Sequence, residues 1–304
     1  MIVNTAQDFL DQLEGGDYPA DTPACARAVM MVEPAEFSVC TESAADNHYM
    51  NLDDAVDAGR ALEQSRGLAD LVRRQGIKLV SFPGDPDTPD AIFPNNVFAT
   101  TPGKLIIGHM LHPGRQVEAE RDDIRRYFQS RAYDSIDLSQ QDCVAELTGT
   151  LIIDHARRIG FCGMTGRVDE AGLAAMHDAF RLKMVFSFAL QAEEYHTNVI
   201  MMVLAGRACV IYPPAFVDPL VPAAIARAFP ERTLVLSENE KNAFAGNCIA
   251  LTGRDLFMSQ TGVDALRAES LARLKDWGFV VHSTPLDEIE KAGGSLRCML
   301  AEVF

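Results

Sequence analysis

Cys298 and His196 are the residues of this chain whose types fit a nucleophile and a general acid–base. Cys298 closely follows the pair Gly293 and Gly294, in a run that ends at Phe304 and is typical of a strand. Glycine admits positive φ and has no side chain, so the backbone there can approach a ligand closely. A cysteine paired with a distant histidine is typical of a thiol nucleophile and base that folding brings together. The alternative for Cys298 is a small buried hydrophobe.

Polar groups stand at the start of five predicted strands. Together they supply a thiol, an imidazole, a carboxylate and several amides, which are the components of nucleophilic catalysis. If these strand starts meet near one axis, the groups converge on a single pocket. The five segments are Phe93–Asn96, Ala145–Gly149, Glu194–Asn198, Phe244–Asn247 and Gly293–Cys298.

A repeated pattern of apolar runs predicts the elements that carry these groups. Four stretches have strand-like runs on either side of a glycine-containing turn, which is the signal of a β-hairpin. They recur about every 50 residues, as in propellers and arrays. Their ranges are 96–108, 150–162, 198–212 and 247–259.

Helical periodicity fills the intervals between the hairpins. The predicted helices are 52–75, 118–131, 169–182, 219–228 and 263–277, each followed by a short extended run. Residues 28–32 and 298–304 are the natural halves of a fifth hairpin, and pairing them would close a ring without an exposed strand edge. We therefore expect one domain over residues 1–304, with no linker.

Composition excludes several classes of function. A formal net charge of −16 argues against binding to nucleic acid or to anionic membranes, which requires clustered Lys and Arg. No apolar run reaches the roughly 20 residues of a membrane span, and no secretory signal is visible. The seven cysteines include no CxxC pair, which favours reduced thiols in the cytoplasm over disulfides or a metal site. We expect a small-molecule partner and no cofactor or metal; the sequence does not indicate an oligomeric state.

The order Phe-x-x-Asn, Glu, His-x-Asn and Gly-Gly-Ser-x-Arg-Cys resembles the guanidine-modifying (pentein) superfamily of arginine deiminases, dimethylarginine hydrolases and amidinotransferases. Its citrulline-utilisation hydrolase branch is most similar to four strings of this chain, namely Phe93–Asn96, Tyr195–Val199, Phe244–Asn247 and Arg297–Phe304. The resemblance extends from Val29 to the last residue. It implies an α/β fold, a five-bladed α/β propeller with pseudo-fivefold repeats, in agreement with the repeats found above.

The resemblance also implies roles for individual residues. Cys298 would attack the central carbon of a guanidino or ureido group, His196 would protonate the departing nitrogen and then activate water, and Glu146 would orient the substrate nitrogens. This chain departs from the branch at Leu147, where the branch has the first glycine of Leu-Glu-Gly-Thr-Gly. Arg167 would hold the substrate carboxylate, for which a planar guanidinium is suited. The substrate-binding set is Phe93, Asn95, Asn96, Asn198, Arg167 and Arg297.

Each assignment has a structural alternative. His196 alone is typical of a hydrogen-bonded structural histidine, and Glu146 of a solvated loop charge. Arg167 also fits an ordinary arginine at a helix start. Asn96 and Asn198 also fit turn caps.

Asn96 and Asn198 bear on the substrate, because arginine-processing members of the superfamily commonly have aspartate at both positions. A buried cation without its partner charge costs on the order of 3–5 kcal/mol, whereas a neutral ureido group has no such penalty. We therefore expect a cysteine-dependent C–N hydrolase of a ureido or guanidino amino acid, citrulline before arginine derivatives, that releases ammonia. The alternatives are an amidinotransferase, a dimethylarginine-type hydrolase, or a catalytically silent binding protein on the same fold.

Overall fold

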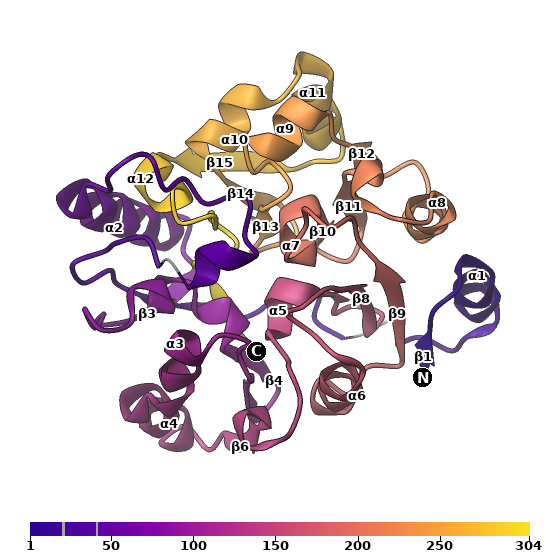
Figure 1. Ribbon diagram of the computed structural model, residues 1–304. Coiled ribbons are helices and arrows are strands. Elements are labelled where there is room, and N and C mark those ends of the chain that lie inside the picture. Colours follow the sequence, from indigo (N-terminus) through magenta and orange to yellow (C-terminus); the bar gives the residue numbers. More distant parts are fainter. Residues whose placement is uncertain (20–21, 41) are drawn as a thin grey trace.

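The computed structural model describes residues 1–19, 22–40 and 42–304, and within these ranges the strands form five separate sheets, none of which closes on itself. Each sheet contains an antiparallel strand pair and a third strand parallel to the second. The α/β fold and its repeated unit are therefore as the sequence predicts. Figure 1 shows the sheets arranged around the middle of the molecule, with helices towards the outside.

The strands of the five sheets are as follows. The first sheet has β16 (Ala301–Val303), β2 (Ala28–Val32) and β3 (Lys78–Phe82); the second has β4 (Phe98–Thr101), β5 (Lys104–Ile107) and β6 (Asp134–Asp137). The third has β7 (Leu151–Asp154), β8 (Ile159–Met164), β9 (Met184–Ala189) and β1 (Ile2–Val3). The fourth has β10 (Met201–Leu204), β11 (Ala208–Ile211) and β12 (Thr233–Val235), and the fifth has β13 (Ile249–Ala250), β14 (Asp255–Ser259) and β15 (Val280–Thr284).

Except for α1, the longer helices lie in or overlap the intervals where helical periodicity predicts them. They are α1 (Ala6–Gly15), α2 (Ala58–Arg74), α4 (Asp122–Gln129), α6 (Glu170–Ala179), α8 (Leu220–Arg227), α10 (Gln260–Ala265) and α11 (Ala268–Asp276). The short helices are α3 (Pro113–Gln116), α5 (Leu147–Thr150), α7 (Thr197–Ile200), α9 (Glu238–Asn242) and α12 (Asp287–Glu290). Among these longer helices, α1 is the one that the periodicity did not predict.

The predicted helix over 263–277 is wrong in one respect, because the chain breaks it between α10 and α11. Leu266 has extended backbone angles at this point. The N–H of Arg267 donates to Oε1 of the buried Glu240, at 3.0 Å, instead of to a helix carbonyl, and its guanidinium bonds Oε2 of the same carboxylate. A buried carboxylate requires such partners, and satisfying it interrupts the helix.

The predicted pairing of the two ends of the chain is confirmed. Strand β16 runs antiparallel to β2, with Ala301 opposite Met30. Cys298 lies three residues before β16, so this pairing fixes where the thiol enters the middle of the molecule. The sequence did not reveal β1, which adds a fourth strand next to β9 with Ile2 opposite Val185.

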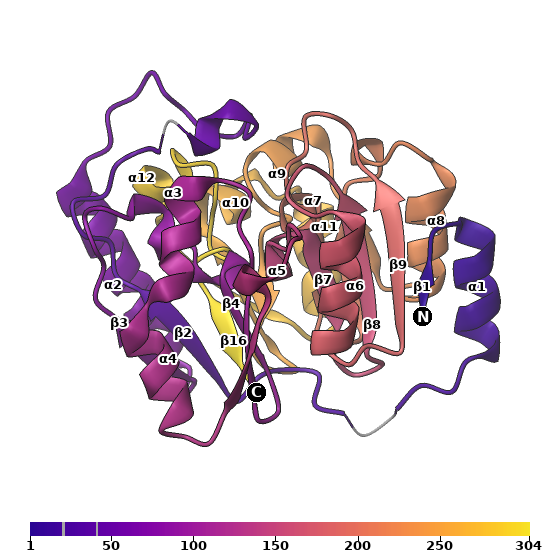
Figure 2. The same cartoon turned by 60° about the horizontal axis from the view of Figure 1, so that its bottom comes forward.

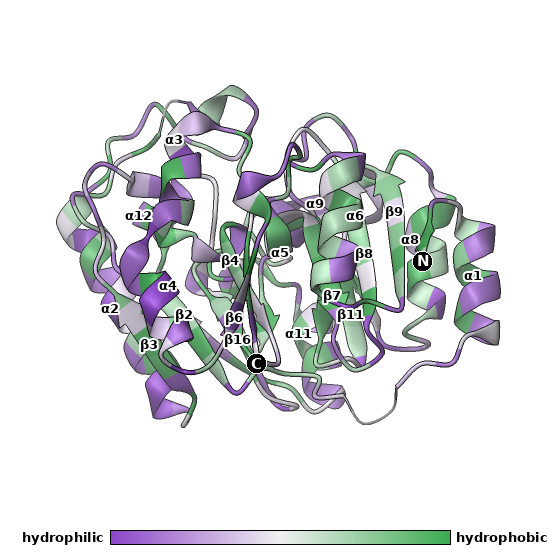
Figure 3. Cartoon of the chain, turned by 90° about the horizontal axis from the view of Figure 1, so that it is seen from below, coloured by the Kyte–Doolittle hydropathy of each residue, from purple (hydrophilic) through white to green (hydrophobic). Residues whose placement is uncertain are grey.

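Burial explains the position of the helices. The strands β10 and β11 are buried along their whole length, and α2 turns a stripe that includes Ala61, Leu68 and Val72 towards the core. Figure 3 shows hydrophobic colouring on β8 and β11 and hydrophilic colouring on one side of α1 and α4. All seven cysteines are free. None of the described helices is long and apolar enough to cross a membrane.

The starts of the first strands of the sheets lie together. The short helices α5 and α7 precede β7 and β10 and contact each other, and α5 also contacts the 3₁₀ turn η3 (Pro94–Asn96) that precedes β4. Figure 2 shows α5 and α7 above the C-terminus, so the starts of β7 and β10 and the C-terminus of the chain lie at opposite sides of the molecule. The fold therefore brings the predicted polar segments to one side of the molecule.

We expect Met30→Ala to destabilise the protein by about 2–5 kcal/mol, because the side chain is 1% exposed in the strand that holds β16. Urea unfolding at constant slope measures this loss. The control is Val217→Ala, a loop side chain that is 55% exposed, which should change stability by less than about 0.5 kcal/mol. Equal stability of the two variants would contradict the packing described here.

Candidate active site

A small cavity lies beside Cys298, at the side of the molecule where the strands begin. Three residues predicted for the substrate site, Phe93, Asn96 and Arg167, line it together with Cys298. The other lining residues are Ser43, Asn47, Asp90, Arg115, Tyr195, Ala292 and Gly294. The cavity therefore joins a thiol to amides, a carboxylate and two guanidinium groups.

The Cys298 side chain is 1% exposed and contacts two amides. Its Sγ accepts hydrogen bonds from Nδ2 of Asn247, at 3.3 Å, and from Nδ2 of Asn198, at 3.6 Å. Burial raises the pKa of this thiol above its ordinary value of 9.0, and the amide donors act in the opposite sense. No hydrogen bond between Cys298 and His196 is found among the described residues.

His196 is fully buried at the start of α7. Its Nε2 lies 2.8 Å from Oε2 of Glu146, whereas its Nδ1 has no hydrogen-bond partner. Burial lowers the pKa of His196 below its ordinary value of 6.5, and the hydrogen bond and charge of Glu146 oppose this effect. The unpartnered Nδ1 is thus free to exchange a proton with a bound molecule.

Gly149 leaves space between His196 and Asn96. A Cβ atom at this position would lie 2.9 Å from Nδ1 of His196 and 2.7 Å from Oδ1 of Asn96, which are shorter than ordinary contacts. Oδ1 of Asn96 is also buried without a partner. Two unpartnered polar atoms therefore border the space that a larger side chain would fill.

Glu146 is fully buried and contacts three other segments of the chain. Its oxygens accept from the N–H of Leu111, at 3.1 Å, and from Nη1 of Arg167, at 3.1 and 3.2 Å, in addition to the contact with His196. Burial opposes ionisation, but the charge of Arg167 and the contact with His196 hold the pKa of Glu146 below its ordinary value of 4.5. Neither Glu146 nor His196 is among the residues that line the Cys298 cavity, and the contact between them joins their two segments.

The departure of this chain from the branch pattern has a visible consequence at Leu147. Its φ is 25°, in the left-handed region that glycine occupies at the lowest cost. The side chain is nevertheless fully buried in a cluster with Ala145 and Leu151. The backbone after Glu146 thus takes a conformation suited to glycine although a leucine is present.

Two buried guanidinium groups face the cavity, each with a carboxylate partner. Nε and Nη2 of Arg167 each donate to Asp46 at 2.7 Å, in addition to the bond with Glu146. Nε and Nη2 of Arg115 each donate to Glu118 at 2.9 Å. The sequence reasoning missed Arg115, although its spacing to Glu118, three residues on, is that of a helical ion pair.

Asp90 is the acidic group of the cavity. Its Oδ2 accepts from the Ser43 hydroxyl at 2.6 Å, but its Oδ1 is buried without a partner. The sequence indicated nothing beyond a loop residue here, since the aspartate precedes the Phe93 motif without any distinguishing spacing. Asn47 was also missed, because no pattern surrounds it.

Three predicted substrate-binding residues do not line this cavity. Asn95 bonds Oγ1 of Thr148 at 3.3 Å, and Asn198 lies behind the sulfur of Cys298. Arg297 points elsewhere, donating to the carbonyl of Leu300 at 2.6 Å and to Oε2 of Glu302 at 3.1 Å. Side chains on neighbouring residues of a chain point in different directions, so Arg297 and Cys298 face different spaces.

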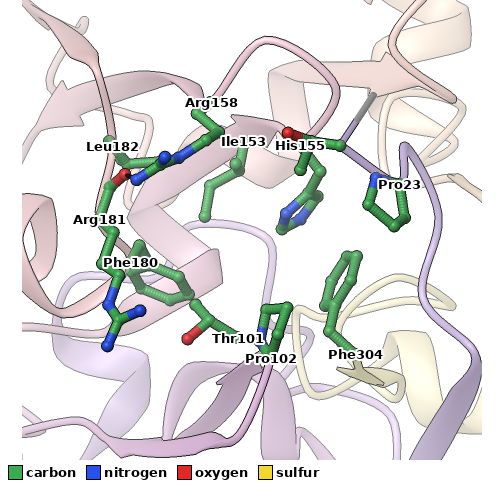
Figure 4. Close-up of a pocket in the computed structure, with 11 residues that line it drawn as sticks. Pro23, Thr101, Pro102, Ile153, His155, Arg158, Phe180, Arg181, Leu182 and Phe304 are labelled. Atoms are coloured by element: carbon green, nitrogen blue, oxygen red, sulfur yellow. Dashed lines mark hydrogen bonds between the residues drawn. The ribbon is translucent and has the colours of Figure 1, made fainter. Parts of the chain in front are cut away.

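A larger and more apolar cavity lies at the opposite ends of the strands (Figure 4). Its lining includes Thr101 and Pro102 from the β4–β5 turn and His155 and Arg158 from the β7–β8 turn. In Figure 4 the rings of His155 and Phe304 face this cavity. No thiol or carboxylate side chain is among its lining residues, so it lacks the groups for the predicted chemistry.

Among the residues that the structure describes, no group of three or more His, Cys, Asp and Glu side chains is arranged to hold a metal ion.

Comparisons with known proteins agree with the motifs. Two curated relatives are the bifunctional arginine dihydrolase/ornithine cyclodeaminases AgrE of Nostoc sp. and ArgZ of Synechocystis sp., 25% and 24% identical over 244 residues. Each match covers 80% of this chain and 33% of the relative, so this chain spans about a third of the relatives' length.

Solved structures share the fold. The N-terminal domain of ArgZ, described as an arginine dihydrolase and solved with bound substrate, superposes with a TM-score of 0.79 at 22% identity, over 91% of this chain and 97% of that one. A dimethylarginine dimethylaminohydrolase adduct with S-methyl-L-thiocitrulline superposes with a TM-score of 0.73 at 17% identity, over 91% and 99%.

The family model of N,N dimethylarginine dimethylhydrolase, eukaryotic, matches residues 33–304, which is most of the chain and includes every residue that lines the Cys298 cavity. The chain therefore belongs to this family of the guanidine-modifying (pentein) superfamily.

Proposed function

We propose that this protein is a cysteine-dependent hydrolase of a guanidino or ureido amino acid, with Cys298 as nucleophile and His196 as proton shuttle. One observation carries the proposal: two residues that line the cavity with the thiol, Asp90 and Asn96, each have a buried Oδ1 without a partner, and the unpartnered Nδ1 of His196 borders the same space at Gly149 as Oδ1 of Asn96. A buried polar atom without a partner costs about 1–3 kcal/mol. A substrate that bonds all three would remove this cost.

The charges of the cavity favour an amino acid with a cationic side chain. Arg115 and Arg167 line it and suit the α-carboxylate, while the free oxygen of Asp90 suits a cation. Arginine has both charges, and arginine dihydrolase is the activity in the names of the two curated relatives. Arginine is therefore our first candidate substrate.

Citrulline is the second candidate, on the evidence of Asn96. Its neutral amide oxygen faces the cavity and accepts an N–H from a guanidino or a ureido group equally well. Asn198, in contrast, contacts the sulfur and Thr148, so its geometry supports no selection between the two groups. One cavity could thus process arginine and then the citrulline formed from it.

In the proposed reaction the sulfur of Cys298 forms a bond to the central guanidino carbon. The bond from that carbon to a terminal nitrogen breaks, and ammonia leaves with a proton from His196. Water then adds to the carbon, gives a proton to His196, and the C–S bond breaks to restore the thiol. Arginine yields citrulline and ammonia. Glu146 holds His196 through Nε2 and thereby leaves Nδ1 directed at the reacting groups.

We further propose that the five sheets are the blades of a propeller in one catalytic domain over residues 1–304. The repeated strand pattern and the pairing of β16 with β2 support this arrangement. The free thiols support a reducing, cytoplasmic location.

Cys298→Ala should lower kcat by about 10³-fold or more, because only the thiol forms the covalent bond. Ammonia release from arginine measures the loss. Cys162→Ala is the control, since burial raises the pKa of that thiol to about 12 and it lines neither cavity. Retained turnover in Cys298→Ala would eliminate the proposed mechanism.

The dependence of kcat/KM on pH should be bell-shaped. The active form requires a thiolate and an imidazolium, while burial lowers the pKa of His196 below 6.5 and raises that of Cys298 above 9.0. Activity is therefore expected to be level between pH 6.5 and 9.0, to fall on an acid limb centred below pH 6.5, where both groups are protonated, and to fall on a basic limb centred above pH 9.0, where both have lost their protons. A rate that rises continuously from about pH 6 to 10 would contradict this assignment.

Asp90→Asn should lower kcat/KM for arginine by about tenfold or more, and for citrulline by less, because only arginine has a cationic side chain. The matched control is Asp87→Asn, an exposed change in the same loop. An equal loss for both substrates would mean that Asp90 binds the α-ammonium group.

The same assay distinguishes the alternative functions through its products. Dimethylamine released from dimethylarginine would indicate a dimethylarginine hydrolase, and a requirement for an amine acceptor would indicate amidino transfer. Binding of these compounds without any product would indicate a silent binding protein.

A further inference from the structure

Asn247 and Asn198 are side-chain amides that both direct an N–H at the sulfur of Cys298. The Nδ2–Sγ distances are 3.3 Å for Asn247 and 3.6 Å for Asn198, and both residues are fully buried. The sequence noted Asn247 only as a polar residue at a strand start. The sequence analysis predicted Asn198 as a substrate-binding residue.

The orientation of the Asn247 amide is fixed by its other bonds. Its Oδ1 accepts from the backbone N–H of Arg297 at 3.0 Å, and its Nδ2 donates to the carbonyl of Asn198 at 3.0 Å. A flipped amide would place oxygen against that carbonyl and NH2 against that N–H, losing both bonds. The second hydrogen on Nδ2 is shared between the sulfur, at 3.3 Å, and Oδ1 of Asn198, at 3.4 Å.

The backbone around Asn247 is held just as closely. A Cβ atom at Gly246 would lie 2.3 Å from the carbonyl oxygen of Val199, so only glycine allows the two strand-start segments to approach this far. The N–H of Asn247 also donates to the carbonyl of Phe244, at 2.9 Å. These contacts hold the Asn247 amide in place, so it can donate to the sulfur without a rearrangement of the backbone.

We infer that Asn247, assisted by Asn198, is the group that stabilises the Cys298 thiolate before substrate binds. This inference rests on the proposed role of Cys298 and adds a residue to it. A hydrogen bond donated to the charged form of an acid favours that form, so the two amides increase the fraction of thiolate. They do so without a hydrogen bond from His196, which leaves the imidazole available for proton transfer.

The charged and titratable groups near the sulfur come from several elements. Those that line the cavity are Asp90, Arg115, Arg167 and Tyr195. The charge of Arg297 acts on the thiol, and Nδ1 of His196 borders the space beside Oδ1 of Asn96. The hydroxyl of Tyr195 donates to the carbonyl of Gly293 at 2.7 Å, and Arg115 and Arg167 are paired with carboxylates. Sγ accepts side-chain hydrogen bonds from Asn247 and Asn198, and as a thiol it also donates to Oδ1 of Asn198 at 3.8 Å. A backbone hydrogen bond of Ser295 lowers the thiol pKa as well.

The test is the pKa of Cys298 in the substrate-free protein, measured as the pH dependence of its alkylation rate by iodoacetamide, with peptide mass spectrometry to isolate this cysteine. Asn247→Asp replaces the donor by an acceptor of the same shape. It should raise the thiol pKa by about one unit or more, a tenfold loss of thiolate at neutral pH. Asn247→Ser replaces the amide by a hydroxyl that ends one bond nearer the backbone, so it withdraws the Nδ2 donor from the sulfur without adding a charge and should shift the pKa in the same direction.

Asn95→Asp is the matched control. It also puts a carboxylate into a buried position of a site segment, but its side chain bonds Thr148 and not the sulfur, so its shift should be clearly smaller. Thermal unfolding identifies any variant that fails to fold. If Asn247→Asp does not fold, the thiol pKa of Asn247→Ser decides whether the inference holds. A Cys298 pKa within about 0.3 units of wild type in folded Asn247→Asp or Asn247→Ser would overturn the inference. Because alkylation requires no turnover, this result is independent of whether Cys298→Ala abolishes activity.

Discussion

The buried carboxylate of Glu146 is the interaction on which the rest of the site depends. It bonds His196, Arg167 and the N–H of Leu111, which come from three separate segments. A carboxylate removed from water must be paired and hydrogen-bonded, and removing one partner of a buried pair costs about 3–5 kcal/mol. The segments that carry these partners are therefore held against Glu146, and the orientation of His196 follows from this packing.

Most charged groups around this carboxylate form ion pairs, and Asp90 is the exception. Arg167 lies between Glu146 and Asp46, and Arg115 is paired with Glu118. Only one oxygen of Asp90 accepts a hydrogen bond, from the hydroxyl of Ser43. Among the described charged groups that line the cavity, Asp90 is therefore the one without an ion-pair partner. A cationic substrate would complete the set. From Asn96 and Asn198 alone, the sequence predicted a substrate with a neutral ureido group. The sequence does not show that Asp90 also lines the cavity.

The fold was more accessible from the sequence than the site. Hairpins, helices and the pairing of residues 28–32 with the C-terminal strand follow from periodicity and turn chemistry, and Cys298, His196, Phe93 and Asn96 follow from motifs at strand starts. What motifs do not specify is the direction of a side chain. Arg297 and Asn198 adjoin the sulfur in sequence or in space but do not line the cavity. Arg115, in α3, and Asp90, in the 3₁₀ turn Pro89–Ile92, line it although neither belongs to a motif at a strand start.

The central claim is that Cys298 forms a covalent bond to the guanidino carbon, and trapping that adduct tests it most directly. Protein mixed with arginine and quenched in acid would be digested, and the peptide with Cys298 weighed. We predict a fraction of this peptide heavier by the mass of arginine less ammonia, with unchanged masses for the peptides of the other six cysteines. Ammonia release at full rate with no adduct on Cys298, or with an adduct on another cysteine, would contradict the account.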